Sequence, residues 1–320
     1  GIWVCLSALT AALMIFRGRY QFIEKLSLLM IGLFAIFTLA CVIGVQYTEF
    51  AMTRAQIIEG LSFWNGIPIA VIGVAIAAFG ITGVGGDEVM AYNYWLLEKG
   101  YAARTGPREE TPAWNHRAKG WIKVMYWDAF LSMLVYTFMT VAFYMLGAAI
   151  LHAQGLKPEG FDTVKTLSRM YTDSLGSWAE IAFLIGAFFV LFSTLFSALA
   201  AWSRLFSDAF SSVGWMDYHN PVSRGRMIAI LSFFFPALWA VLFFVFKDPV
   251  WMVLAGGAIT AAILLLVVAG SVHFRYRRLP ASLRPSAAYD IGFWISVISI
   301  VLLAILAVWK AIEQFQSQVS

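Results

Sequence analysis

Long apolar stretches separated by short polar loops make up nearly all of the chain. A membrane-spanning helix needs about 20 predominantly apolar residues, and most of these stretches reach that length. No loop between them is long and polar enough to suggest a separate soluble domain, so the pattern predicts a single transmembrane domain over residues 1–320. The eight predicted spans lie at about 1–16, 22–46, 64–98, 120–150, 178–203, 226–247, 250–273 and 290–312.

The composition agrees with this pattern and narrows the class of protein. Of the 320 residues, 61% are hydrophobic and 12% are charged, against about 45–50% apolar and about 25% charged residues in soluble domains. Such a chain cannot cover itself with polar surface in water, which predicts an all-α integral membrane protein embedded in a lipid bilayer. The sequence contains no Ser/His/Asp set, phosphate loop or zinc-ligand spacing, so we expect neither an enzyme nor a resident cofactor.

Lysine and arginine gather on one side of the predicted topology. One set of alternate loops, with the adjoining span ends, carries 16 of the 22 Lys and Arg residues, and the other set carries 5. Because basic loops stay on the cytoplasmic side, we expect loops 17–25, 99–119, 204–225 and 274–289 to be cytoplasmic, in a bacterial cytoplasmic membrane. The net charge of +4 is modest, so we expect no nucleic acid partner. The arginines after the seventh span are expected to anchor it to lipid headgroups: Arg275, Arg277 and Arg278.

The start of the chain predicts that further residues precede it. The first apolar run, 2–16, is only 15 residues long, and no initiator Met is present. Eight spans with the basic loops inside would also put both ends outside, which is awkward for a complete protein without a signal sequence. We therefore expect an odd number of spans upstream and interpret the chain as N-terminally truncated.

The third predicted span is too long for one membrane helix and contains a break. Its 35 residues, 64–98, would form a helix of about 50 Å, against a hydrocarbon core of about 30 Å. Near its middle, four glycines are followed by two adjacent acids: Gly80, Gly83, Gly85, Gly86, Asp87 and Glu88. Each glycine weakens a helix by about 1 kcal/mol relative to alanine, so we expect the span to be broken over 80–88.

Two adjacent carboxylates at membrane depth need a partner, because each costs about 2.5 kcal/mol or more in the hydrocarbon region. No Lys or Arg lies near the centre of a predicted span, which argues against an internal ion pair and favours a bound cation at Asp87 and Glu88. Unwound backbone at a helix break also offers carbonyl ligands to cations. The alternative is a glycine-rich packing face whose acids reach to the membrane interface.

Three segments resemble the Nramp-type divalent metal transporters. Gly-Gly-Asp-Glu-Val-Met-Ala-Tyr-Asn at 85–93 is similar to the sixth helix of that family, where a Gly precedes Met-Pro-His-Asn by three or four residues. Gly-Arg-Tyr-Gln-Phe-Ile-Glu-Lys at 18–25 resembles the start of its fifth helix, and Asp-Ala-Phe-Leu-Ser at 128–132 resembles its seventh. The resemblance runs from the fourth helix to the eleventh, which places three upstream helices outside the chain.

The resemblance implies a LeuT-like inverted-repeat fold, with metal held between the broken first and sixth helices. The sixth helix of the family supplies a backbone carbonyl and, three residues on, a methionine sulfur, which fall on Asp87 and Met90. Together with Glu88, these residues form the expected metal site. Thr260 stands where the tenth helix of the family offers a Gln to the metal. The Asp-Pro-Gly-Asn motif of the first helix has no counterpart here, so half of the site would belong to the upstream helices.

Departures from the family pattern bear on coupling and selectivity. Ala91 stands in place of the Pro and Tyr92 in place of the His of the sixth-helix motif, which leaves coupling to a proton, or to no ion, open. Carboxylates and carbonyls suit Mg and Mn, whereas a thioether favours softer metals such as Fe. The pattern leans toward the Nramp-related branches, which include magnesium-type transporters.

Five further residues are expected to line or support the site, Thr260 among them. Gly86, Tyr92 and Asn93 adjoin the break, and we expect Asn93 to cap or steady it. Asp128, near the start of the fourth span, either lines the inner vestibule or complements the helix N-terminus as a first-turn acid.

Three functions follow as hypotheses. The first is a secondary transporter of divalent cations of the Mn, Fe and Mg class, which works by alternating access around the broken helix with the metal as its substrate. The second is a LeuT-fold symporter, in which the acids bind an organic amine, an amino acid or a coupling cation. The third is a degenerate membrane module that transports nothing.

Overall fold

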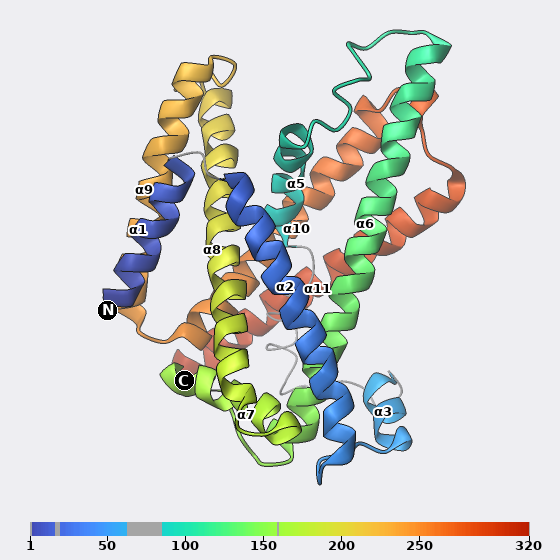
Figure 1. Ribbon diagram of the computed structural model, residues 1–320. Helices are drawn as coiled ribbons and strands as arrows, with labels where there is room; N and C mark the ends of the chain where they lie inside the picture. The colour runs from blue at the N-terminus through green and yellow to red at the C-terminus, as the bar shows by residue number, and fades with distance from the viewer. Residues whose placement is uncertain (1, 17–19, 63–84, 159, 320) are drawn as a thin grey trace. The chain divides into compact units, whose positions relative to one another are not determined.

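The computed structural model describes residues 2–16, 20–62, 85–158 and 160–319. Every regular element in these ranges is a helix, as the sequence predicts (Figure 1). The α-helices are α1 (Ile2–Phe16), α2 (Tyr20–Gly44), α3 (Arg54–Leu61), α5 (Gly86–Glu98), α6 (Pro112–Leu146), α7 (Thr163–Leu175), α8 (Ala179–Ser212), α9 (Pro221–Phe246), α10 (Pro249–His273) and α11 (Ala287–Val319). Short 3-10 and π-helical turns extend or connect them: η1 (Val45–Tyr47), η3 (Gly147–His152), η4 (Gly160–Asp162), η5 (Phe274–Arg278) and η6 (Ala281–Leu283).

Six helices in the described residues are long and apolar enough to cross a membrane, which agrees with an integral membrane protein. They correspond to six of the eight predicted spans: Leu28–Tyr47, Pro112–His152, Ala179–Ser212, Pro221–Phe246, Pro249–Arg278 and Ala287–Leu306. The first predicted span is the apolar but shorter helix α1. Of the third predicted span, only the part that forms α5 belongs to the described residues, and Gly80 and Gly83 lie outside them.

Two helices extend well beyond the apolar segments from which they were predicted. α6 begins at Pro112 rather than near 120, and α8 continues to Ser212 rather than ending near 203. Hydropathy marks where a helix is apolar, but the helix itself continues through polar residues until its backbone is capped. Residues 204–212, in a loop expected to be cytoplasmic, therefore belong to α8.

α8 ends at a position with a left-handed backbone conformation, which favours glycine. Gly214 has a φ of +81°. Its N–H donates to the carbonyl of Ser211, and the N–H of Trp215 donates to the carbonyl of Phe210, both at 2.9 Å. The rings of Phe210 and Trp215 stack with their centroids 5.1 Å apart. These two hydrogen bonds and the apolar contact form a Schellman motif, which explains why the helix stops here.

The contacts divide the chain into two compact units. The first unit contains residues 1–65 and 134–252, and the second contains 66–133 and 253–320. A division by contacts does not decide how many domains fold independently, so the single transmembrane domain over 1–320 stays a prediction.

In the first unit, α8 is the central helix: it contacts α1, α2, α7 and α9 (Figure 1). The contact with α2 depends on Gly186, because a Cβ atom there would overlap the ring of Phe34. Small residues allow membrane helices to approach this closely. On the second half of α8, Trp202 packs edge-on against Phe235 of α9 with ring centroids 5.5 Å apart.

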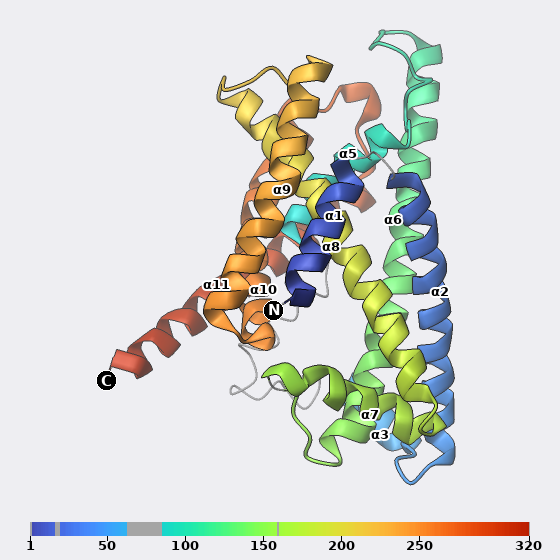
Figure 2. The ribbon, with the colours of Figure 1, turned by 60° about the vertical axis from the view of Figure 1, so that its left-hand side comes forward.

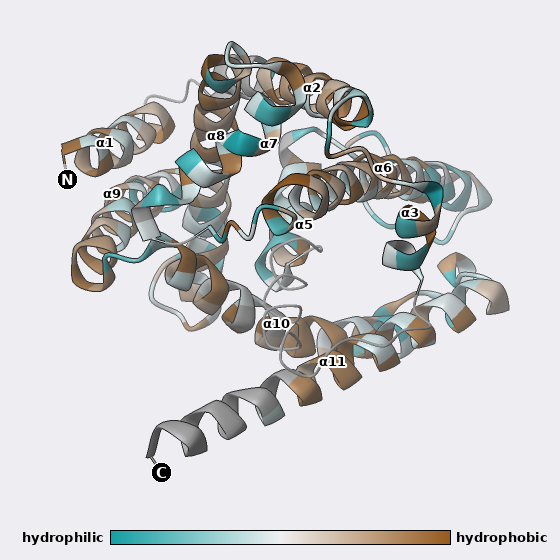
Figure 3. Ribbon diagram, turned by 90° about the horizontal axis from the view of Figure 1, so that it is seen from below, coloured by the Kyte–Doolittle hydropathy of each residue, from teal (hydrophilic) through white to brown (hydrophobic). Residues whose placement is uncertain are grey.

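The short helices α3 and α7 lie between predicted spans in the sequence, and α7 is amphipathic. Figure 3 shows hydrophilic residues on α3 and α7. In α7, Met170, Tyr171 and Ser174 are buried, and their spacing of one, three and four residues defines one helix face. This face packs against α2 and α8, across whose ends α7 lies (Figure 2).

Tyr171 is the centre of this packing. Its ring is fully buried, stacks against Phe37 with a centroid distance of 5.2 Å and packs at a tilt against Phe183 with a centroid distance of 4.6 Å. Its hydroxyl lies 3.0 Å from Oγ1 of Thr38, which is also fully buried. Because Thr38 donates its own proton to the carbonyl of Phe34 at 2.9 Å, Tyr171 is the donor between the two hydroxyls. Burial raises the pKa of Tyr171, which keeps the hydroxyl protonated.

We expect Tyr171→Phe to lower the free energy of unfolding by about 1 kcal/mol, the usual net value of a buried hydrogen bond. The ring contacts remain in this variant, so the loss isolates the hydroxyl. Thermal unfolding of the purified protein in detergent measures it. Tyr47→Phe is the matched control, because Tyr47 is 88% exposed and its hydroxyl contributes nothing to a core. Equal melting temperatures for the two variants would contradict the assignment.

Candidate functional site

α5 starts within the predicted break. Gly85 precedes it in an extended conformation, with φ −61° and ψ 156°, and its carbonyl accepts a hydrogen bond from the N–H of Val89 at 3.0 Å. Oε2 of Glu88 accepts a hydrogen bond from the N–H of Gly85, also at 3.0 Å. A glutamate at the third helical position that reaches back in this way forms half of a capping box. Glu88 therefore fixes the point at which α5 begins.

The two acids of the first turn belong to different faces of α5. Successive residues of an α-helix are rotated by about 100°, whereas residues three or four apart share a face. Asp87 therefore shares a face with Met90, and Glu88 shares a face with Tyr92. Asp87, Met90 and Tyr92 are half-buried, whereas Glu88 is exposed. Asp87 and Glu88 thus begin two separate rows of side chains. The row of Asp87 contains the sulfur of Met90, and the row of Glu88 contains the phenol of Tyr92.

The first turn of α5 lies directly against α10. A Cβ atom on Gly86 would lie 2.7 Å from Cγ2 of Ile263 and 2.9 Å from the backbone nitrogen of Leu264. Only glycine fits at this distance, because backbone atoms of α10 cannot move aside as a side chain could. Thr260 precedes Leu264 by one helical turn and so lies on the same face of α10. The structure therefore brings the helix that carries Thr260 to the start of α5.

Tyr92 joins α5 to α6. Its hydroxyl donates a hydrogen bond to Oδ2 of Asp128 at 2.8 Å, and both side chains are half-buried. The sequence named these two residues separately and gave no sign of their contact, because 36 residues and a loop separate them. The interpretation of Asp128 as a first-turn acid is wrong: α6 begins at Pro112, four turns earlier.

Asn93 does not cap the break. It follows the first residue of α5 by seven positions and its side chain is exposed, whereas an N-cap residue must precede the first turn. Glu88 has that role instead. The residue at the N-cap position is Gly85, which has no side chain that could accept a hydrogen bond. The glutamate at the third helical position was therefore the signal in the sequence for the start of the helix.

The first turn of α5 contains two acids, Asp87 and Glu88. A helix N-terminus carries the equivalent of about +0.5 charge, which offsets a quarter of the two carboxylate charges of Asp87 and Glu88. Within the ranges that the structure describes, no group of three His, Cys, Asp or Glu residues could hold a metal ion. Ligands at this point would have to include the Met90 sulfur, backbone carbonyls or groups beyond those ranges.

These features define a class of protein: a helical integral membrane protein in which a helix begins inside an apolar stretch of chain and presents acids at its start. The family model described as natural resistance-associated macrophage protein-like, abbreviated Nramp, matches residues 1–310. The chain belongs to this family, which confirms the resemblance seen in the sequence. Membership implies the LeuT-like membrane transporter fold and identifies the chain as a metal ion transporter, in which the metal is substrate and not cofactor. The search of curated proteins and the search of solved structures gave no match.

We expect Gly86→Ala to separate α5 from α10 and to lower both the melting temperature and metal transport. The added methyl group would lie 2.9 Å from the backbone nitrogen of Leu264 in α10, and overpacking of this kind costs about 1–3 kcal/mol. Gly120→Ala is the control, since nothing lies within 4 Å of a Cβ atom at that helical position. A melting temperature of Gly86→Ala equal to that of the control would contradict the close approach.

Proposed function

We propose that the chain transports divalent metal cations of the Mn, Fe and Mg class as a secondary transporter, by alternating access around the start of α5. Asp87, Glu88 and Met90 bind the cation in this proposal. The observation that carries it is the start of α5 itself, where a helix interrupts an apolar stretch and gathers negative charge next to a sulfur. Family membership supports the transport of metal in general, and the finer statements rest on the local chemistry.

The two faces of α5 give the ligands different tasks. Asp87 and Met90 share a face, so a carboxylate and a thioether reach one cation together. Glu88 uses one oxygen to accept from Gly85 and offers its second oxygen to the cation. An ionised carboxylate has about four acceptor positions, so capping and binding are compatible.

Ligand types favour a metal over an organic amine. An ammonium group needs hydrogen-bond acceptors, and a thioether is a poor one, whereas divalent Mn and Fe accept both oxygen and sulfur ligands. Met90 on the face of Asp87 therefore has a purpose in a metal site and none in an amine site. Thr260, on the α10 face that meets α5, supplies a further neutral oxygen.

We expect Asp87→Ala to raise the KM for Mn uptake about tenfold or more, which corresponds to at least about 1.4 kcal/mol of lost binding. The protein reconstituted in proteoliposomes is assayed with Mn, Mg and Ca. Glu110→Ala, which removes an exposed acid from a loop, is the control. Unchanged uptake by Asp87→Ala would refute the site, and no uptake of any of the three ions by the unsubstituted protein would refute the divalent-cation proposal.

We also infer that the hydrogen bond between Tyr92 and Asp128 positions α5 for binding. We expect Tyr92→Phe to raise KM about three- to tenfold and to lower the free energy of unfolding by no more than about 1 kcal/mol, because one hydrogen bond contributes about 1 kcal/mol. Asp128→Asn keeps an acceptor for the phenol and should behave nearly as the unsubstituted protein, whereas Asp128→Ala should match Tyr92→Phe. If Asp128→Asn is as impaired as Asp128→Ala, the carboxylate charge matters rather than the hydrogen bond.

A further inference from the structure

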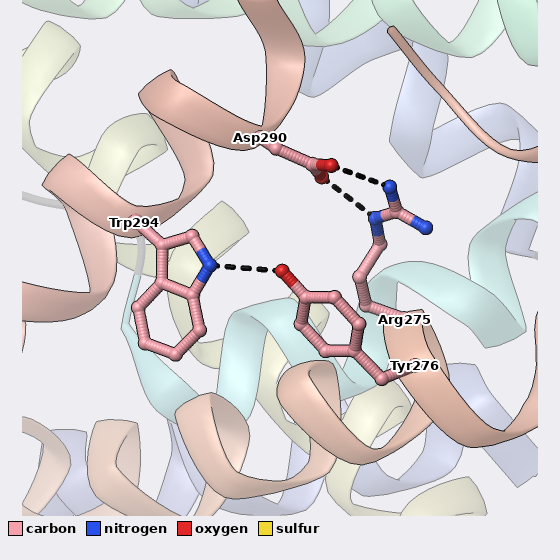
Figure 4. A network of polar contacts seen from close by, with 4 residues as sticks. All are labelled: Arg275, Tyr276, Asp290 and Trp294. Carbon is pink, nitrogen blue, oxygen red and sulfur yellow. Dashed lines mark hydrogen bonds and ion pairs between the residues drawn. The ribbon is translucent and has the colours of Figure 1, made fainter. Parts of the chain in front are cut away.

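The turn between α10 and α11 contains a fixed ion pair. Nε and one terminal nitrogen of Arg275 donate to the two carboxylate oxygens of Asp290 at 2.8 and 2.7 Å (Figure 4). The guanidinium side chain is only 10% exposed. This bidentate pair engages two of the three guanidinium nitrogens of Arg275, and the expectation that Arg275 anchors the helix to lipid headgroups stays a prediction. The pair closes the turn.

Three other arginines in the same turn have no further acid close to them in the sequence. Asp290 is the only acid between Asp248 and Glu313, and it is already paired with Arg275. The remaining arginines are all exposed: Arg277, Arg278 and Arg284. Eight residues of chain therefore carry three guanidinium groups for which the local sequence supplies no acid.

Two aromatic side chains indicate where this turn lies relative to the membrane surface. The indole nitrogen of Trp294, in the second turn of α11, donates to the hydroxyl of Tyr276 at 2.8 Å (Figure 4). Trp294 is 41% exposed and Tyr276 is 47% exposed. The candidate spans of α10 and α11 end and begin on either side of the turn, at Arg278 and Ala287. Exposed Trp and Tyr at span ends are typical of the headgroup level of a bilayer.

We propose that the turn from Tyr276 to Arg284, with Trp294, binds the headgroup of an anionic phospholipid. Guanidinium groups bind phosphate oxygens through paired hydrogen bonds, and the aromatic pair packs against the glycerol and upper acyl region. A soluble acidic partner would not need aromatic side chains at the end of a span, which favours a lipid. Arg277, Arg278 and Arg284 hold the phosphate, while Arg275 with Asp290 keeps the turn in shape. This inference does not depend on which cation is transported.

Native mass spectrometry of the delipidated protein, titrated with phosphatidylglycerol or with zwitterionic phosphatidylcholine, tests the proposal. We expect the triple variant Arg277→Gln, Arg278→Gln, Arg284→Gln to weaken binding of phosphatidylglycerol about fivefold per arginine removed, while binding of phosphatidylcholine stays the same. Single variants at each position should each lose about fivefold. They keep the test valid if the triple variant unfolds, which its melting temperature reports.

The matched control removes three basic charges elsewhere in the second unit, by Arg104→Gln, Arg108→Gln and Lys119→Gln, all exposed residues. This control should retain phosphatidylglycerol as the unsubstituted protein does. An equal loss in both triple variants would overturn the proposal, since net charge alone would then explain the binding. Displacement of phosphatidylglycerol by an equal concentration of inorganic phosphate would also overturn it, because the site would then be one for a free anion.

Discussion

The start of α5 is the constraint on which the candidate site depends. A helix that begins in an apolar stretch leaves its first N–H groups without helical partners, and these groups need acceptors where water is scarce. Here the carboxylate of Glu88 supplies an acceptor from within the same turn. Glu88 therefore stabilises the start of α5 whether or not a cation is bound.

Contacts with two other helices hold this short helix in place. Gly86 touches the backbone of α10, and Tyr92 bonds to Asp128 of α6. The two contacts are six residues apart, about 9 Å along the axis, and the face with Asp87 and Met90 lies between them in sequence. Any displacement of α5 that opens one side of the site must act against one of these contacts. In the proposed alternating access, these two contacts are the interactions that would break and re-form.

The sequence was informative where the information is local. Apolar lengths located six of the eight predicted spans, and glycines followed by acids placed a break over 80–88, within which α5 begins. It was uninformative where a contact joins distant residues: Tyr171 meets Thr38 across 133 positions, and Asp128 meets Tyr92 across a polar loop. Helix ends were also misplaced, because the residues before 120 are polar yet helical and hydropathy does not register capping. The pairing of Arg275 with Asp290 needed the turn geometry, since four arginines compete for one acid in the sequence.

Hydroxyl and carboxylate side chains in this protein obtain their hydrogen-bond partners in different ways. Ser203 and Ser207 of α8 donate to carbonyls of their own helix, at 3.1 and 2.6 Å, so they need nothing from outside. A carboxylate has no proton to give and must find a donor elsewhere. Asp290 finds a guanidinium, which cancels its charge, but Asp128 finds a phenol, which does not. The start of α5 resembles the second case, because Gly85 offers Glu88 a neutral N–H. A neutral donor does not cancel the charge of Glu88, and in the proposed function the transported cation supplies the balancing charge.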